Sequence, residues 1–175
     1  KVIVNGKDMK NKFVNSNYPT NKLIEAEAIR YLDIKLKNRS KLFRKNKKKL
    51  KLLVALDISK KIYEEQLKIV SELYEKKNYK IIICPHPVTA SNLKISNHLS
   101  KLLTKVPFKK LLKLADIVIT SNITVAAVDA YLSGLPVITF LGNDMLNFSP
   151  LRGKKNIKFA SSVDEIEKYI NHFLK

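Results

Sequence analysis

Short apolar runs alternate with longer amphipathic stretches over most of the chain, a pattern typical of strands joined by helices. Nearly continuous apolar runs predict buried strands at 50–56, 79–84, 115–120 and 136–140, with a short edge strand at 157–160. Between these runs, apolar residues at helical spacing predict helices at 60–76, 91–103, 107–114 and 124–133, with a last helix after Ser162. This alternation predicts an α/β fold, a Rossmann-like parallel sheet with helices on both faces.

Local signals support several of these element boundaries. Ser59 and Ser162 stand where N-caps are expected, and Asp164 and Glu165 place negative charge in the first turn of the last helix. Gly134 stands where a helix must stop before the next strand begins. The boundaries are therefore predicted from side-chain chemistry as well as from periodicity.

The first 34 residues form a separate pattern of strand, helix and strand, the size of one β-α-β unit. The chain starts with Lys rather than Met and enters a strand at once, so we expect it to belong to a longer protein. We predict that residues 1–34 are the end of a partner N-terminal domain, that 35–49 form a basic linker, and that 50–175 form a Rossmann-like domain.

Charge and composition narrow the class of protein. The net charge is +19, and ten basic residues with no acidic one fall between Lys35 and Lys51. This run is either a solvated linker or a contact with anionic lipid headgroups, nucleic acid or a polyanionic acceptor. Nucleic acid is not expected as a partner, because no aromatic residues are spaced for base stacking.

Two further features bear on the location of the protein. No apolar run approaches the roughly 18–20 residues that a membrane-spanning helix needs. The single cysteine, Cys84, lies within an apolar run and has no disulfide partner in the chain. We therefore expect a cytoplasmic protein, with peripheral contact to the inner face of the membrane as an option.

Polar and small residues follow three of the predicted strands. They are His86 and Thr89 after the second, Ser121, Asn122 and Thr124 after the third, and Gly142, Asn143 and Asp144 after the fourth. In an open parallel sheet, ligands bind outside the carboxyl ends of the strands. These residues therefore predict one ligand site at that edge.

The segment Ser121–Thr124 precedes an apolar helix, so hydroxyl groups and the first free amides of the helix are expected to converge on an anion such as phosphate. The alternative is that Ser121 or Thr124 is only an N-cap. His86 stands between two prolines that stiffen its loop, and its imidazole can donate to a phosphate or a base carbonyl; the alternative is a histidine bonded to local backbone. No other histidine is assigned a role.

Asp129 lies on an otherwise apolar helix, where an unpaired carboxylate would be costly. The sequence leaves two hydrogen-bonding partners open for this carboxylate. One is the diol of a bound ribose, and the other is a backbone N–H or a lysine of the protein itself.

Taken together, these residues resemble a known family. The stretches 115–120, 124–130 and 134–138 are similar to the carboxyl-terminal domain of GT-B glycosyltransferases. In that family the corresponding helix N-terminus holds the phosphates of the sugar donor, and an acidic residue of the helix often holds the ribose. The resemblance implies phosphate binding by Thr124 with Ser121, ribose binding by Asp129, and a role for 50–175 as the nucleotide-sugar-binding domain.

His86-Pro87 resembles the His-Pro motif of bacterial sialyltransferases and polysialyltransferases, in which the histidine contacts the cytidine nucleotide. The Ser/Thr cluster is similar to their serine-rich motif, except that Thr124-Val125 carries one hydroxyl where the family has two. Residues 4–6 and 25–31 look like the end of the partner domain in surface-carbohydrate biosynthesis proteins of this group. The resemblance therefore implies a donor activated with cytidine monophosphate.

Two departures from the family guide the expected mechanism. In the stretch that resembles the family, Asp129 has no acidic partner seven or eight residues away, which favours inversion, and no Asp-x-Asp motif is present in the chain, so we expect neither a metal nor a cofactor. The general base is expected in the partner domain, and the fragment alone is expected to turn nothing over. The predicted catalytic residue is His86, and the predicted nucleotide-binding residues are His86, Pro87, Thr89, Ser121, Asn122, Thr124, Asp129 and Gly142.

The resulting hypothesis is the donor half of an inverting glycosyltransferase of surface polysaccharide biosynthesis. The donor would be a CMP-linked nonulosonic acid and the acceptor a glycan or glycolipid. Alternatives on the same fold are a CDP-glycerol polyol-phosphate transferase and a UDP-sugar epimerase or transferase. A different class of function remains open, a non-catalytic basic module acting through residues 35–51.

Overall fold

The computed structural model describes residues 1–27, 31, 49–122, 124–142 and 145–174. Contacts within the chain divide it into two compact units, Lys1–Lys35 and Leu36–Lys175. Most of the predicted basic linker, through residue 48, lies outside the described residues.

The first unit is a small β-α-β arrangement. Strand β1 (Val2–Asn5) leads into helix α1 (Gly6–Asn15), a short 3-10 helix η1 (Thr20–Lys22) and strand β2 (Leu23–Ala26). The two strands pair in parallel, with Ile3 opposite Ile24. Val4 and Leu23 are buried, whereas Ile3 and Ile24 are 68% and 43% exposed. Because side chains alternate across a strand, the exposed pair forms an apolar patch on the sheet face opposite the buried pair.

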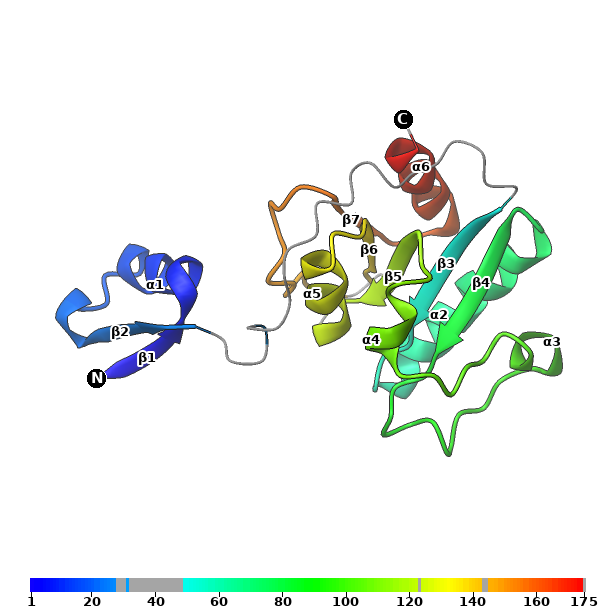
Figure 1. Ribbon diagram of the computed structural model, residues 1–175, viewed down its shortest axis with the longest axis horizontal. Coiled ribbons are helices and arrows are strands. Elements are labelled where there is room, and N and C mark those ends of the chain that lie inside the picture. Colours follow the sequence, from blue (N-terminus) through cyan, green and yellow to red (C-terminus); the bar gives the residue numbers. More distant parts are fainter. Residues whose placement is uncertain (28–30, 32–48, 123, 143–144, 175) are drawn as a thin grey trace. The chain divides into compact units, whose positions relative to one another are not determined.

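The second unit contains a five-stranded parallel sheet in the order β4-β3-β5-β6-β7 (Figure 1). Its strands are β3 (Leu50–Ala55), β4 (Tyr79–Cys84), β5 (Ile117–Ser121), β6 (Val137–Phe140) and β7 (Ile157–Ala160). Its helices are α2 (Lys60–Glu75), α3 (Asn97–Ser100), α4 (Phe108–Leu111), α5 (Val125–Leu132) and α6 (Val163–Phe173). The predicted α/β class, with a Rossmann-like parallel sheet, is confirmed.

Helices cover both faces of this sheet, each over its own apolar core. On one face, α2 and α6 pack on alternate strand residues, in a cluster that includes Leu52, Ile138 and Ile166. On the other face, α4 and α5 cover Leu53, Val118 and Val137. The three interior strands, β3, β5 and β6, are largely buried on both sides, which is why they appear in the sequence as continuous apolar runs. Among the described helices, none combines the length and the apolar character needed to cross a bilayer.

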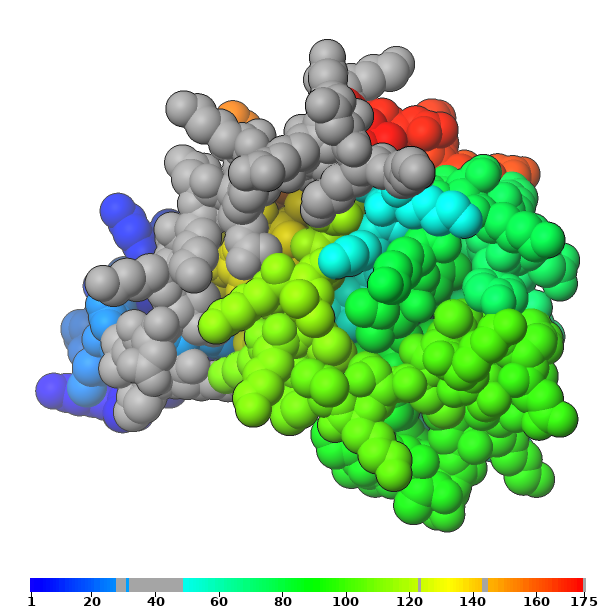
Figure 2. All heavy atoms as spheres, turned by 45° about the vertical axis from the view of Figure 1, so that its right-hand side comes forward, coloured from blue at the N-terminus to red at the C-terminus, as the bar shows by residue number. Residues whose placement is uncertain are grey.

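The predicted helix at 91–103 is wrong for most of its length. Turns occupy residues 87–92, and only Asn97–Ser100 is helical. The segment returns to the edge of the sheet, where Ile83 N–H donates to the carbonyl of Leu102 at 2.8 Å and Thr104 N–H donates to the carbonyl of Ile83 at 3.0 Å. Pairing with β4 thus satisfies backbone N–H and C=O groups of this segment that would otherwise bond to each other within a helix. In Figure 2 this green segment forms a broad continuous part of the surface.

The start of α6 has the serine cap that its sequence predicts, and Glu165 adds a bond to the residue before that cap. Ser162 Oγ accepts a hydrogen bond from Glu165 N–H at 3.3 Å, and Glu165 Oε2 accepts one from Ser161 N–H at 2.7 Å. The bond from Ser161 is the main reason that the pKa of Glu165 is lowered. Charge and capping therefore act together at this helix terminus.

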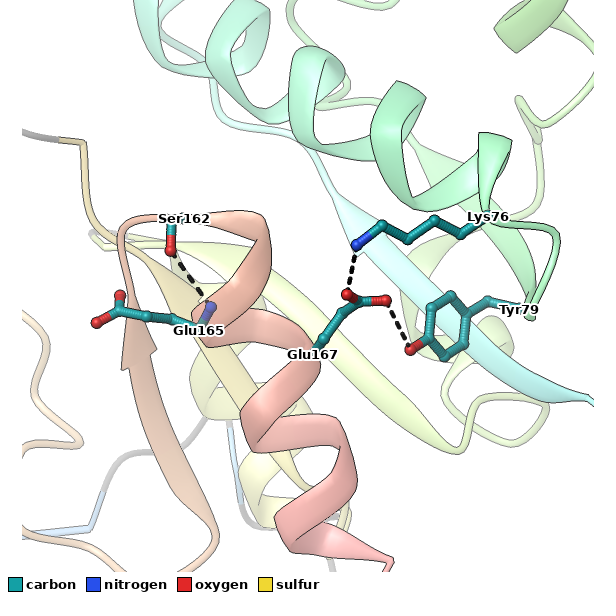
Figure 3. A network of polar contacts seen from close by, with 5 residues as sticks. All are labelled: Lys76, Tyr79, Ser162, Glu165 and Glu167. Atoms are coloured by element: carbon teal, nitrogen blue, oxygen red, sulfur yellow. Dashed lines mark hydrogen bonds and ion pairs between the residues drawn. The ribbon is translucent and has the colours of Figure 1, made fainter.

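A polar contact joins α6 to the end of α2 and the start of β4 (Figure 3). Glu167 accepts hydrogen bonds from Lys76 Nζ at 2.5 Å and from the hydroxyl of Tyr79 at 3.3 Å. Burial, with the nearby Glu167 carboxylate as a smaller cause, raises the pKa of Tyr79 to about 12. The folded state therefore holds this proton more tightly than the unfolded chain, whose tyrosine has a pKa of about 10.

Replacing Glu167 by glutamine is expected to lower the pKa of Tyr79 while leaving it above 10, because burial remains. The stabilisation linked to Tyr79 is complete below pH 10 and is lost as the pH rises from 10 toward 12, and this alkaline loss should shrink in the variant. The titration of Tyr79 is measured by tyrosinate absorbance, taken as the difference between each protein and the same protein carrying Tyr79→Phe. Glu64→Gln, which removes an exposed ion pair with Lys60, is the control. An unchanged Tyr79 titration would contradict the assignment.

Candidate functional site

The sheet has a topological switch point between β3 and β5. From β3 the chain passes to β4 on one side of β3 and then crosses to β5 on the other side. The loops after β3 and β5 therefore leave in opposite directions, and ligands of open α/β sheets bind in the crevice outside the carboxyl ends at this point. The residues that follow β3, β4, β5 and β6 are accordingly those to consider.

His86 follows β4 and is partly exposed, in a short turn. Its carbonyl accepts hydrogen bonds from the backbone N–H of Thr89 at 3.0 Å and from the Thr89 hydroxyl at 3.3 Å. Its ring Nδ1 accepts one from Val88 N–H at 3.3 Å. Because a neutral imidazole that accepts at Nδ1 carries its proton at Nε2, this contact selects the tautomer with an Nε2–H donor. The turn therefore prepares His86 to donate to an anion or a carbonyl.

The residues beside His86 define the rest of this turn. Pro87 is exposed and Thr89 is partly exposed, and Thr89 closes the turn on itself through its two bonds to His86. Cys84, which precedes the turn, is buried, and burial raises the pKa of its thiol. Cys84 therefore acts as a packed apolar residue at this edge rather than as a thiolate nucleophile.

Thr124 is the N-cap of α5 by backbone conformation, and its side chain is partly exposed. Its hydroxyl donates only a long bond of 3.5 Å to the carbonyl of Ser121, and it makes no side-chain cap bond to the helix. The first amides of an α-helix have no partner within the helix, and the helix dipole favours negative charge at that end. Thr124 and the start of α5 thus offer donors suited to a phosphate.

Ser121 and Asn122 lie at the same strand end but are buried, with 0% and 2% of their surface exposed. Ser121 Oγ donates to the carboxylate of Asp57, which follows β3 on the other side of the switch point. Asn122 Nδ2 donates to the carbonyl of Leu146 at 2.5 Å, and Asn122 Oδ1 accepts from Phe148 N–H at 3.1 Å. The polar atoms of both side chains are thus engaged within the protein.

Asp57 lies next to Ser121 at these strand ends and Gln66 lies next to Asp57, and neither was predicted from the sequence. Asp57 is 5% exposed and its Oδ1 accepts from Ser59 N–H at 2.7 Å. Gln66, 1% exposed on α2, accepts from Asp57 N–H at 2.8 Å and donates to the carbonyl of Ala55 at 3.1 Å. The available signal was a glutamine on the apolar face of α2, which requires a buried polar partner.

The remaining predicted residues lie deeper. Asp129 is 3% exposed within α5, and its carbonyl accepts from the hydroxyl of Ser133 at 2.8 Å. Gly142 is buried after β6, and a Cβ added there would lie 2.9 Å from Oε2 of Glu65, a carboxylate of α2. Asn143 and Asp144 are outside the described residues. Binding by Asp129 and Gly142 therefore stays a prediction.

No group of three or more His, Cys, Asp or Glu side chains that could hold a metal ion occurs among the residues that the structure describes. Metal independence itself stays a prediction.

Comparison with known proteins gives a fold-level result. No protein-family model and no curated protein sequence matches the chain. Among solved structures, the chain is similar to WaaG, a glycosyltransferase involved in lipopolysaccharide biosynthesis, with a TM-score of 0.56 and 15% identity over 99% of this chain and 53% of that one.

Two further structures are similar at the same level. Accessory secretory protein 1, 2 and 3 of Streptococcus pneumoniae gives a TM-score of 0.55 and 13% identity over 98% of this chain and 35% of that one. The glycotransferase of kitacinnamycin gives 0.52 and 12% over 91% and 43%. The chain thus spans about half or less of these structures, and it shares the fold of one half of GT-B glycosyltransferases.

Proposed function

We propose, from the fold shared with one half of GT-B glycosyltransferases, that this chain is the donor-nucleotide-binding part of an inverting glycosyltransferase. The observation that carries the proposal is the position of His86 and Thr124, which follow β4 and β5 at the carboxyl edge of a sheet whose switch point lies between β3 and β5. Both side chains are partly exposed there, and both offer hydrogen-bond donors.

The proposed chemistry uses these donors on the leaving group. An acceptor hydroxyl attacks the anomeric carbon of the donor sugar, the bond from that carbon to the phosphate oxygen breaks, and its electron pair passes to the phosphate. The Nε2–H of His86 and the start of α5 stabilise the charge that develops on this phosphate. The proton of the acceptor passes to a general base, which we place in a part of the enzyme outside this chain.

Nucleotide recognition completes the proposal. Thr124 and the amides beside it hold the phosphate together with the Nε2–H of His86, whose turn is shaped by Pro87 and Thr89. Asp129 takes the ribose; because it is only 3% exposed, side chains around α5 must move for the diol to reach it. We propose a CMP-linked nonulosonic acid as the donor and a surface glycan or glycolipid as the acceptor.

The small sheet of the first unit supports the proposal of a further, N-terminal domain. Two parallel four-residue strands form too small a sheet to be stable alone, and the exposed pair of Ile3 and Ile24 leaves one face open. We propose that residues 1–34 complete the sheet of the N-terminal domain and that a basic linker at 35–49 joins it to the nucleotide-binding domain. The basic run is then also the segment available to an anionic membrane surface.

Titration of the chain with CMP, CDP, UDP and GDP, followed by heteronuclear NMR, tests the proposal. We expect cytidine nucleotides to bind and to shift amide resonances beside His86 and Thr124. His86→Ala and Thr124→Val should each weaken binding by about 10-fold or more, since each removes a hydrogen bond to a charged group.

His98→Ala is the matched control, because His98 lies on α3 with its ring bonded to Ser71 at 3.0 Å, away from the strand ends. Preference for UDP would favour a UDP-sugar transferase or epimerase, and preference for CDP over CMP a polyol-phosphate transferase. If no nucleotide binds, or if His98→Ala weakens binding as much as His86→Ala, the proposed site is wrong. Salt-sensitive binding of polyanions that survives both site substitutions would favour a basic binding module instead.

A further inference from the structure

The switch point of the sheet is bridged by a buried hydrogen bond between two loops. Asp57 follows β3 and Ser121 ends β5, and these strands are neighbours in the sheet. The hydroxyl of Ser121 donates to Asp57 Oδ2, while Asp57 Oδ1 accepts from Ser59 N–H at 2.7 Å. The bond therefore connects the turn that begins α2 to the turn that begins α5.

The chemistry of a hydroxyl limits what Ser121 can do for a ligand. A serine has one hydroxyl hydrogen, and in Ser121 this hydrogen is directed to Asp57. The lone pair that remains on Ser121 Oγ can only accept a hydrogen bond, so it cannot donate to a phosphate. The residue is also 0% exposed. Ser121 thus affects the anion site by fixing the backbone from which Thr124 and α5 start, three residues further on.

Asp57 is also held in place by Gln66 of α2. Gln66 accepts from Asp57 N–H at 2.8 Å and donates to the carbonyl of Ala55 at 3.1 Å, so the turn after β3 is tied to α2 at two backbone positions. The carboxylate receives donors on both oxygens, from Ser121 and Ser59. A carboxylate that is bonded through both oxygens has a defined position and little freedom to reorient.

We infer that Asp57 is a positioning residue for the phosphate subsite and that Ser121 acts through Asp57 rather than by touching the ligand. The inference rests on the proposed function, which it deepens by assigning the Asp57–Ser121 pair to the phosphate of the nucleotide. Loss of the pair should leave recognition of the nucleoside intact and weaken recognition of the phosphate, because the start of α5 is then free to shift away from its ligand-binding position.

The test compares Asp57→Ala, Ser121→Ala and the double variant, each checked for folding by thermal unfolding. Binding of CMP and of cytidine is measured for each, together with UDP and uridine. We expect each single variant to reduce the preference for nucleotide over nucleoside by about 10-fold, and the double variant to be no worse than either single one. A variant that is merely less stable would lose both ligands together.

Asp116→Ala is the matched control. Asp116 also links β3 to β5, accepting a hydrogen bond from Lys51 N–H at 3.0 Å, but it lies just before β5, at the opposite edge of the sheet. We expect the preference of this variant for nucleotide over nucleoside to stay within about 2-fold of the wild-type value. Loss of phosphate recognition in Ser121→Ala but not in Asp57→Ala, or additive losses in the double variant, would overturn the inference, since Ser121 would then contact the ligand directly.

A second measurement separates this inference from the proposed function. In ligand-free protein, the amide resonances of residues 124–127 should shift in both Asp57→Ala and Ser121→Ala and remain in place in Asp116→Ala. If wild-type protein binds no nucleotide, the proposed function fails while these shifts still report whether the pair positions the start of α5. Unshifted resonances in the two variants would overturn the inference whatever the protein binds.

Discussion

Truncation of Ile138 to alanine is expected to destabilise the protein by about 2–5 kcal/mol, because it removes a fully buried aliphatic side chain from the middle of β6. Ile138 is 0% exposed and belongs to the core cluster under α2 and α6 that also contains Ile119 and Ile166. Packing from strands on both sides prevents the backbone from closing the cavity. Urea unfolding followed by circular dichroism measures the loss.

Ile58→Ala makes the same change at a side chain that is 52% exposed. We expect it to cost less than about 1 kcal/mol, since little apolar surface is returned to water. If the two variants unfolded at the same urea concentration, the face of β6 would have been assigned to the core wrongly. A large loss at Ile138 alone instead supports the register in which Ile138 lies beside Ile119.

The buried strands could be predicted from the sequence because burial on both faces removes the need for polar positions. Strands β5 (Ile117–Ser121) and β6 (Val137–Phe140) are buried at every position and lie within two residues of their predicted bounds. The edge strands Tyr79–Cys84 and Ile157–Ala160, which are only partly buried, also have their predicted boundaries. Helix α6 begins after Ser162 as predicted, because its capping signals lie within a few residues of each other. Gly134, with φ of +76°, ends the turn after α5 in a conformation that glycine adopts without strain. Local chemistry was sufficient in each case.

The segment at 91–103 could not be predicted in this way. Its apolar residues Leu93, Ile95, Leu99 and Leu102 are compatible with a helix, yet they pack on the core cluster from a mostly irregular chain. The deciding interactions are the bonds between Ile83 and the backbone of 102–104, which join parts of the chain far apart in sequence. Tertiary pairing of this kind overrides local helical spacing.

The candidate site shows the same division. The edge of the sheet and the residue types on it follow from the strand pattern, since parallel strands bring their carboxyl ends together. The partners of Ser121 and Asn122 do not follow, because they are Asp57, 64 residues earlier, and the backbone of 146–148, more than 20 residues later. Sequence therefore indicates where a ligand is expected but not which polar atoms the fold has already engaged.

Replacing Asn122 by alanine is expected to release the loop at residues 146–148. The Asn122 amide donates to the carbonyl of Leu146 and accepts from the N–H of Phe148, so one side chain holds two backbone groups of that loop. Leu146 and Phe148 have side chains that are 73% and 62% exposed, and packing does little to restrain them. We expect a loss of about 1–3 kcal/mol in stability and faster cleavage by chymotrypsin after Leu146 and Phe148.

Asn122→Asp distinguishes this clamp from general loss of packing. A carboxylate can still accept from Phe148 N–H, but its second oxygen would face the carbonyl of Leu146, so the acid should not restore the clamp. Asn171→Ala, on the exposed side of α6, is the control and should leave cleavage unchanged. If Asn122→Asp protected the loop as well as asparagine does, the bond to Leu146 would be dispensable. Full protection in Asn122→Ala would mean that the loop is held by contacts other than this amide, and Asn122 would then be available to a ligand.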